Sequence, residues 1–178
     1  MMSSSPSASS LAAAACGGAF MCLLSDALFV PGPGPGSALG SPGDAALLLA
    51  GTPPIRLAAA TVLGVMGIAT WTLATPALLR VSRATGPTRA LLALLHVVFV
   101  GLCGAFHVVT GCLGWVGRLA PSPAAAAEVV APLMTAIQLA MGPTLLLLAI
   151  VLAVATWRGR RRTPWALPVV SPIFSFSV

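Results

Sequence analysis

The residues best suited to chemistry are an aspartate and a histidine, Asp26 and His107, each inside a long apolar stretch. An ionisable side chain within a membrane span is costly unless it is paired, and such residues commonly serve a function. A carboxylate opposite an imidazole can carry a proton or bind a ligand head group. The two residues therefore predict a small polar pocket. Two alternatives remain open: an internal hydrogen bond that only fixes helix packing, and an Asp26 close enough to the membrane surface to be hydrated.

Metal, cofactor and nucleophilic chemistry are not indicated. The second histidine, His96, is separated from His107 by about 16 Å along one predicted helix, too far for the two to share a metal ion. The four cysteines form no CxxC motif and lie within apolar stretches, where they pack as small apolar residues. Ser25 directly precedes Asp26, so the two side chains point about 100° apart on a helix and suggest no catalytic serine. We expect no metal and no cofactor.

The composition decides the class of protein. Of the 178 residues, 58% are hydrophobic and 7% are charged, whereas a globular domain is about half apolar and about a quarter charged. So few charged groups cannot cover a soluble protein of this size, which excludes a soluble enzyme domain and a nucleic-acid-binding module. The apolar residues fall in long blocks, so we predict an all-α, multi-pass integral membrane protein whose main partner is the lipid bilayer.

The apolar blocks define the predicted helical bundle. A hydrocarbon core of about 30 Å needs roughly 20 apolar residues in a helix. A fifth apolar stretch, 164–178, reaches only about 22 Å and is expected to be a truncated or re-entrant helix. Residues 1–10 are predicted to be disordered, and residues 31–54 form a loop rich in proline and glycine, with a short helix after Asp44. The four predicted spans, within a single membrane domain over 11–178, are 11–30, 57–79, 90–117 and 129–157.

The arginines predict the orientation. Seven of the nine follow the second and fourth predicted spans, whereas only Arg56 and Arg118 lie on the opposite side. Short cytoplasmic loops are enriched in basic residues, so the larger group and the N-terminus are expected in the cytoplasm. The run after the fourth span is interpreted as a membrane anchor and not as a nucleic-acid site. The larger group consists of Arg80, Arg83, Arg89, Arg158, Arg160, Arg161 and Arg162.

Helical periodicity predicts which faces turn inward. In the third span, small and polar residues share one face and bulky apolar residues, including Val109 and Leu113, share the opposite face, which is expected to meet lipid. Asp26 in the first span and Gln138 in the fourth lie on similar stripes, at about the depth of His107. Thr61 of the second span lies in the same half of the membrane. The candidate ligand or proton site therefore comprises Asp26, His107, Gln138 and Thr61.

Three short motifs resemble a family of uncharacterised multi-pass membrane proteins. Residues 25–29 (Ser-Asp-Ala-Leu-Phe) resemble the family's Gly-Asp-x-Leu-Phe ending of the first helix, and residues 104–107 (Gly-Ala-Phe-His) resemble its Gly-Ala-aromatic-His motif. Pro164 and Trp165, followed by Ser171 and Pro172, resemble a Pro-x-Trp…Asn-Pro start of a fifth helix. The resemblance implies a site at Asp26 and His107, no assigned activity, and a chain that continues through fifth and sixth helices.

The sequence departs from that family at three points. Ser25 stands where the family has glycine, Pro164 and Trp165 are adjacent, and Ser171 stands where asparagine precedes the proline. The last two departures weaken the match to the fifth helix most.

Three functions remain open at this stage. The first is a membrane protein of unknown activity whose Asp26/His107 pocket binds a ligand or carries protons. The second is an intramembrane enzyme that modifies a lipid or isoprenoid, with the same pair as acid and base. The third is a structural or assembly subunit. A membrane-protein partner or a second copy of the chain is the further partner that the sequence leaves open.

Overall fold

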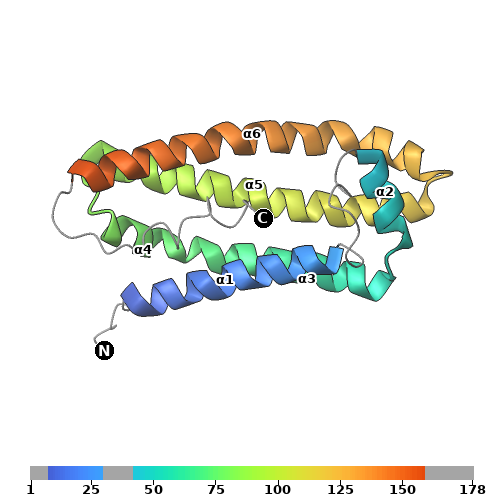
Figure 1. The fold of residues 1–178 in the computed structure, drawn as a ribbon, viewed down its shortest axis with the longest axis horizontal. Coiled ribbons are helices and arrows are strands. Elements are labelled where there is room, and N and C mark those ends of the chain that lie inside the picture. Colours follow the sequence, from blue (N-terminus) through green and yellow to red (C-terminus); the bar gives the residue numbers. More distant parts are fainter. Residues whose placement is uncertain (1–7, 30–41, 159–178) are drawn as a thin grey trace, which may run out of the picture.

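A computed structural model describes residues 8–29 and 42–158 (Figure 1). Within these residues, four segments are long and apolar enough to cross a membrane: Ser10–Phe29, Pro54–Arg80, Gly86–Leu119 and Ala124–Thr156. The predicted all-α bundle with four spanning segments is therefore confirmed. The predicted fifth segment, 164–178, lies outside the described residues. The helices are α1 (Ala8–Phe29), α2 (Pro42–Gly51), α3 (Pro54–Thr72), α4 (Ala74–Val81), α5 (Gly86–Leu119) and α6 (Pro123–Arg158).

The spanning helices lie side by side in the order α6, α5, α3 with α4, and α1 (Figure 1). Helix α5 is central, with α3 on one side and α6 on the other. The short α2 lies across one end of the bundle against α5 and α6, and buries Ala46 and Leu49 there. It begins at Pro42, two residues before the predicted start at Asp44. We refer to this end of the molecule as the α2 end.

The outer surface of the bundle is apolar. Large hydrophobic side chains are exposed on every spanning segment, for example Phe20, Val62, Leu94 and Leu139, at 67%, 56%, 60% and 71% of their surface. A soluble protein rarely exposes such extensive apolar surface. The helical content and this surface together fit contact with a lipid bilayer.

The second spanning segment consists of two helices, where the sequence predicted one. Proline has no N–H, so Pro76 cannot bond to the carbonyl of Thr72, four residues earlier. The hydroxyl of Thr75 donates to that carbonyl instead, over 2.8 Å, and α3 ends there. The Thr75 oxygen also lies 2.9 Å from Nδ1 of His96, which is buried. Because the single hydroxyl proton is committed to Thr72, His96 Nδ1 must donate to Thr75.

Helices α1 and α3 approach until their backbones touch. A Cβ atom on Gly18 would lie 2.7 Å from the carbonyl oxygen of Gly67, and one on Gly67 would lie 2.7 Å from the carbonyl oxygen of Gly18. Small residues permit this kind of close contact between membrane helices. The buried residues of α1 recur at alternating steps of four and three: Leu11, Ala15, Gly18, Cys22, Ser25 and Phe29.

The central place of α5 corrects one prediction about its faces. Its polar and small residues, among them His96, Cys103 and His107, are buried as predicted. Val109 and Leu113 are buried as well, although periodicity assigned them to lipid. They pack in one apolar cluster with Val130, Met134 and Ile137 of α6. A helix between two neighbours buries two faces, and a single amphipathic stripe does not predict the second.

Replacing Gly18 by alanine is expected to destabilise the protein by about 1–3 kcal/mol, because the new methyl group meets immobile backbone. Gly17→Ala is the matched control, since a Cβ atom there meets nothing within 4 Å. Alanine at position 17 should be neutral or raise stability by up to about 1 kcal/mol through its higher helix propensity. Unfolding in mixed detergent micelles, followed by circular dichroism, measures both. Equal effects of the two substitutions would contradict the backbone contact.

Candidate functional site

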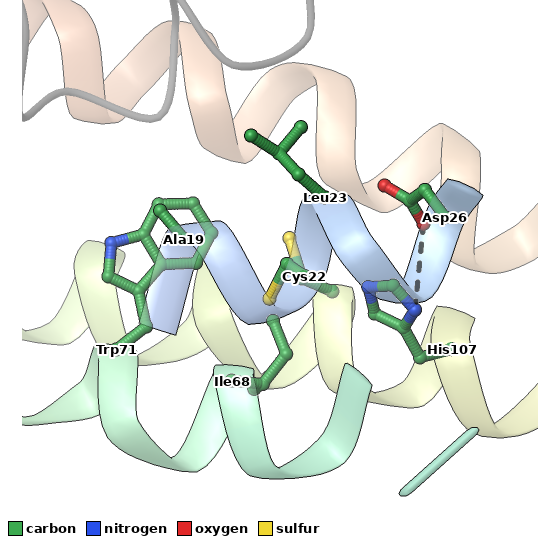
Figure 2. Close-up of a pocket in the computed structure, with 8 residues that line it drawn as sticks. Ala19, Cys22, Leu23, Asp26, Ile68, Trp71 and His107 are labelled. Atoms are coloured by element: carbon green, nitrogen blue, oxygen red, sulfur yellow. Dashed lines mark ion pairs between the residues drawn. The ribbon is translucent and has the colours of Figure 1, made fainter. Parts of the chain in front are cut away.

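The candidate site lies toward the α2 end, where α1, α3 and α5 meet (Figure 2). His107 of α5 is buried, whereas the side chain of Asp26 on α1 is 55% exposed. The Asp26 carboxylate oxygen Oδ1 lies 3.8 Å from His107 Nδ1. The structure thus brings together the two residues that the sequence singled out. Asp26 is exposed at the surface of the bundle, whereas His107 is enclosed.

A third residue, Ser25, belongs to the site although the sequence analysis set it aside. Ser25 is fully buried, and its hydroxyl donates to the carbonyl of Ala60 on α3 over 2.7 Å. Its oxygen lies 3.3 Å from His107 Nδ1. With the hydroxyl proton committed to Ala60, the oxygen accepts, so Nδ1 carries the hydrogen. That N–H is directed to Ser25 and is also close to the Asp26 carboxylate.

The buried face of α1 explains why Asp26 is exposed. The alternating four-and-three spacing puts Ser25 at the centre of this face, and Asp26 follows about 100° around the helix. The prediction that Asp26 points directly inward is therefore wrong, because it lies at the margin of the contact. The same spacing was the signal in the sequence that could have identified Ser25.

A glycine on α3 makes room for the histidine. A Cβ atom on Gly64 would lie 2.7 Å from two atoms of the His107 ring and 2.9 Å from the Ser25 hydroxyl. On its other side, His107 stacks with Phe29 at the end of α1, with ring centroids 6.3 Å apart and an angle of 23° between planes. The ring is thus held between α3 and α1, which fixes its orientation toward Ser25 and Asp26.

Arg56 secures the end of α1 that carries the site. Its Nε donates to the carbonyl of Leu28 over 2.7 Å, and its Nη2 donates to the carbonyl of Ala27 over 3.2 Å. The last carbonyls of a helix have no partner within the helix, and a cation there also complements the helix dipole. Arg56 therefore attaches the final turn of α1 to the start of α3. From the sequence alone, Arg56 indicates only the orientation in the membrane.

The two remaining candidates do not join the site. The hydroxyl of Thr61 donates to the carbonyl of Leu57 in its own helix, and its side chain faces Gly111, one turn beyond His107 on α5. Gln138 is exposed on α6, so the prediction that it faces inward is wrong. Helix α6 uses bulky residues such as Met134 and Ile137 for its contact with α5, and its stripe of small and polar residues lies elsewhere.

A small pocket adjoins the pair. Its lining comes from α1, α3 and α5 and includes Ile68, Trp71 and two thiols, Cys22 and Cys103 (Figure 2). Its volume of about 20 Å³ accommodates about one water molecule. Asp26 and the half-exposed Leu23 stand at the rim. The pocket is therefore suited to a water molecule next to His107 and not to a bulky group.

The geometry differs from that of a catalytic triad. In a triad, the nucleophile and the carboxylate engage opposite nitrogens of the histidine. Here Ser25 and Asp26 both approach Nδ1, and the serine hydroxyl is buried and bonded to a carbonyl. Within the described residues, no group of three or more histidine, cysteine or acidic side chains is placed to hold a metal ion. What the arrangement can do is hold and exchange a proton.

Comparison with known proteins adds no family assignment. No family model, curated protein or solved structure matches the chain. The resemblance to a family of multi-pass membrane proteins therefore stays a prediction.

His107→Ala and Asp26→Ala should lower the stability of the protein by different amounts. His107→Ala is expected to cost about 1–3 kcal/mol, because it leaves the buried Ser25 oxygen without its donor. Asp26→Ala should cost less than about 1 kcal/mol, because the carboxylate is half-exposed. If the two interact, the double variant deviates from additivity by about 0.5 kcal/mol or more. The free energies of unfolding in mixed micelles complete this cycle.

His96 provides the control for the cycle. It is buried on the same helix, about 16 Å from His107, and bonds to Thr75. Asp26→Ala and His96→Ala should therefore be additive. Additivity of Asp26→Ala with His107→Ala as well would show that the pair is not coupled.

Proposed function

We propose that the protein is an integral membrane protein that binds and exchanges a proton at Asp26 and His107 on its outward side. The observation that carries this proposal is the contact of a half-exposed carboxylate with a buried imidazole at 3.8 Å. Imidazole is the side chain that changes charge most readily near neutral pH. The exposed carboxylate of Asp26, three residues before the end of the first span, is the group through which a proton can reach it. The pocket beside the pair has room for a bridging water molecule.

The orientation rests on the distribution of arginines. Arg80, Arg83 and Arg89 follow the second spanning segment, at the end opposite α2, and a further four follow the fourth. Basic residues in short loops favour the cytoplasm, which supports an outward position for the α2 end and the site and a cytoplasmic N-terminus. Arg56, one of the two arginines at the α2 end, is engaged in capping α1.

The buried residues of α5 favour a site that serves one side of the membrane. On α5, the buried residues between His107 and His96 are Phe99, Val100 and Cys103, which are poor proton carriers. A proton bound at His107 therefore returns by way of Asp26. This geometry favours a sensor of external pH, or a site whose charge state affects the bundle, over a proton pathway across the membrane.

The two other functions have less support. An intramembrane enzyme needs convergent polar groups that reach a substrate, and here the serine and the carboxylate share one nitrogen of His107. A purely structural pair would not require an exposed carboxylate. If the pair is only structural, the NMR signals of the His107 ring should not change with pH.

Histidine-selective NMR tests proton binding directly. The chain contains two histidines, so ¹⁵N-histidine labelling of the full chain in lipid nanodiscs gives two sets of ring signals. We expect the signals of His107 to change as the pH is lowered from neutral into the acidic range, because the exposed Asp26 carboxylate gives a proton access to this ring. The signals of His96, enclosed and bonded to Thr75, should stay constant and serve as the internal control.

Asp26→Asn removes the carboxylate at nearly constant shape. This variant should move the pH at which the His107 signals change, while the protein stays folded. His107 signals that are constant over the whole range in the wild type would refute proton binding and favour the structural role.

The orientation is tested with cysteine labelling in sealed cells. Ser122→Cys, in the exposed turn between α5 and α6, should react with an impermeant reagent added outside, whereas Thr85→Cys, between α4 and α5, should react only after permeabilisation. The parent protein, whose four cysteines lie in spanning segments, gives the background. Labelling of Thr85→Cys in intact cells would reverse the orientation.

A further inference from the structure

Gln138 is a polar residue near the middle of the fourth spanning segment, and it has no hydrogen-bond partner among the described residues. The fourth spanning segment, Ala124–Thr156, has its midpoint at residue 140, so Gln138 lies only about 3 Å from the centre of the span. Its side chain is exposed on α6, and no hydrogen bond connects it to any residue in the described part of the chain. The membrane surface is about 12 Å away, beyond the reach of a glutamine side chain.

Two of the three threonines of α6, Thr144 and Thr156, satisfy their hydroxyl groups within their own helix. Thr144 donates to the carbonyl of Ala140 over 2.7 Å, and Thr156 donates to the carbonyl of Ala153 over 2.9 Å. A glutamine amide carries two donors and an acceptor oxygen, so it needs partners outside the helix. In hydrocarbon, such a group is stabilised by hydrogen bonding to a neighbouring helix.

The surface around Gln138 is open to a second helix. Gly142, one turn further on, has nothing within 4 Å of the position where a Cβ atom would lie, and Thr135, one turn earlier, is exposed. Helix α6 is also the least enclosed span, with 11% of its most apolar window buried against 28% to 39% in the other three. Close approach over a glycine next to an amide is typical of helix pairs in membranes.

We infer that α6 pairs with α6 of a second copy of this chain, in parallel, through Gln138. Three properties favour a second copy over another partner. A primary amide is self-complementary, because each can donate to the oxygen of the other. A two-fold axis perpendicular to the membrane puts both Gln138 residues at the same depth without further adjustment. The same axis brings the two Gly142 residues together, where the helices must approach most closely.

Single-molecule photobleaching tests this dimer in the full chain. The protein carries one fluorophore per copy and is reconstituted in vesicles at low density. We expect two-step bleaching for the wild type. Gln138→Leu should weaken the dimer by about 3- to 30-fold, as measured by energy transfer on dilution with lipid, which corresponds to the loss of interhelical hydrogen bonds.

A second variant and a control separate the interface from the fold. Gly142→Leu adds bulk at a position that is open in one copy, so the fold should persist while the dimer dissociates. Ala140→Leu, exposed on another face of α6, should leave the dimer unchanged. Single-step bleaching of the wild type, more than two steps, or a dimer that survives both Gln138→Leu and Gly142→Leu would overturn the inference.

Discussion

The close contact between α1 and α3 is the constraint on which the site depends. At Gly18 and Gly67 the two backbones touch, and no side chain fits between them. About 10 Å further along α1, the same approach lets the Ser25 hydroxyl reach the carbonyl of Ala60 over 2.7 Å. Wider helix spacing would separate these groups, and it would leave a serine hydroxyl unsatisfied in an apolar environment.

The two histidines of the bundle are satisfied in the same way, each through a neighbouring hydroxyl group. His107 donates toward Ser25, which donates to α3, and His96 donates to Thr75, which donates to the carbonyl freed by Pro76. Each histidine is thus tied through a hydroxyl to the backbone of the second spanning segment. In a medium without water, such pairs of consecutive hydrogen bonds, from histidine to hydroxyl and from hydroxyl to carbonyl, hold the helices in register.

The sequence predicted the elements better than their contacts. Length and hydropathy were sufficient to predict the four spans, because a bilayer imposes a minimum apolar length.

The inward face of α5 was predicted from its histidines and glycines. On α1 the inward polar residue was predicted to be Asp26, whereas the neighbouring Ser25 is the buried one, because alanines on both sides of the true contact blur the periodicity. The stripe with Gln138 was recognised, but a stripe of small residues does not say which neighbour it meets. The end of α3 at Thr72, four residues before Pro76, was not predicted because prolines are tolerated inside membrane helices.

Arg56 makes the end of the first span depend on the second span. The carbonyls at the end of α1 receive their hydrogen bonds from a residue at the start of the next span, 28 residues after Leu28. The end of the first span is therefore complete only when the second is in place beside it. A fragment that stops before Arg56 retains the apolar length of α1 and loses the cap of its last turn. The stability of α1 therefore cannot be assigned to its own sequence alone.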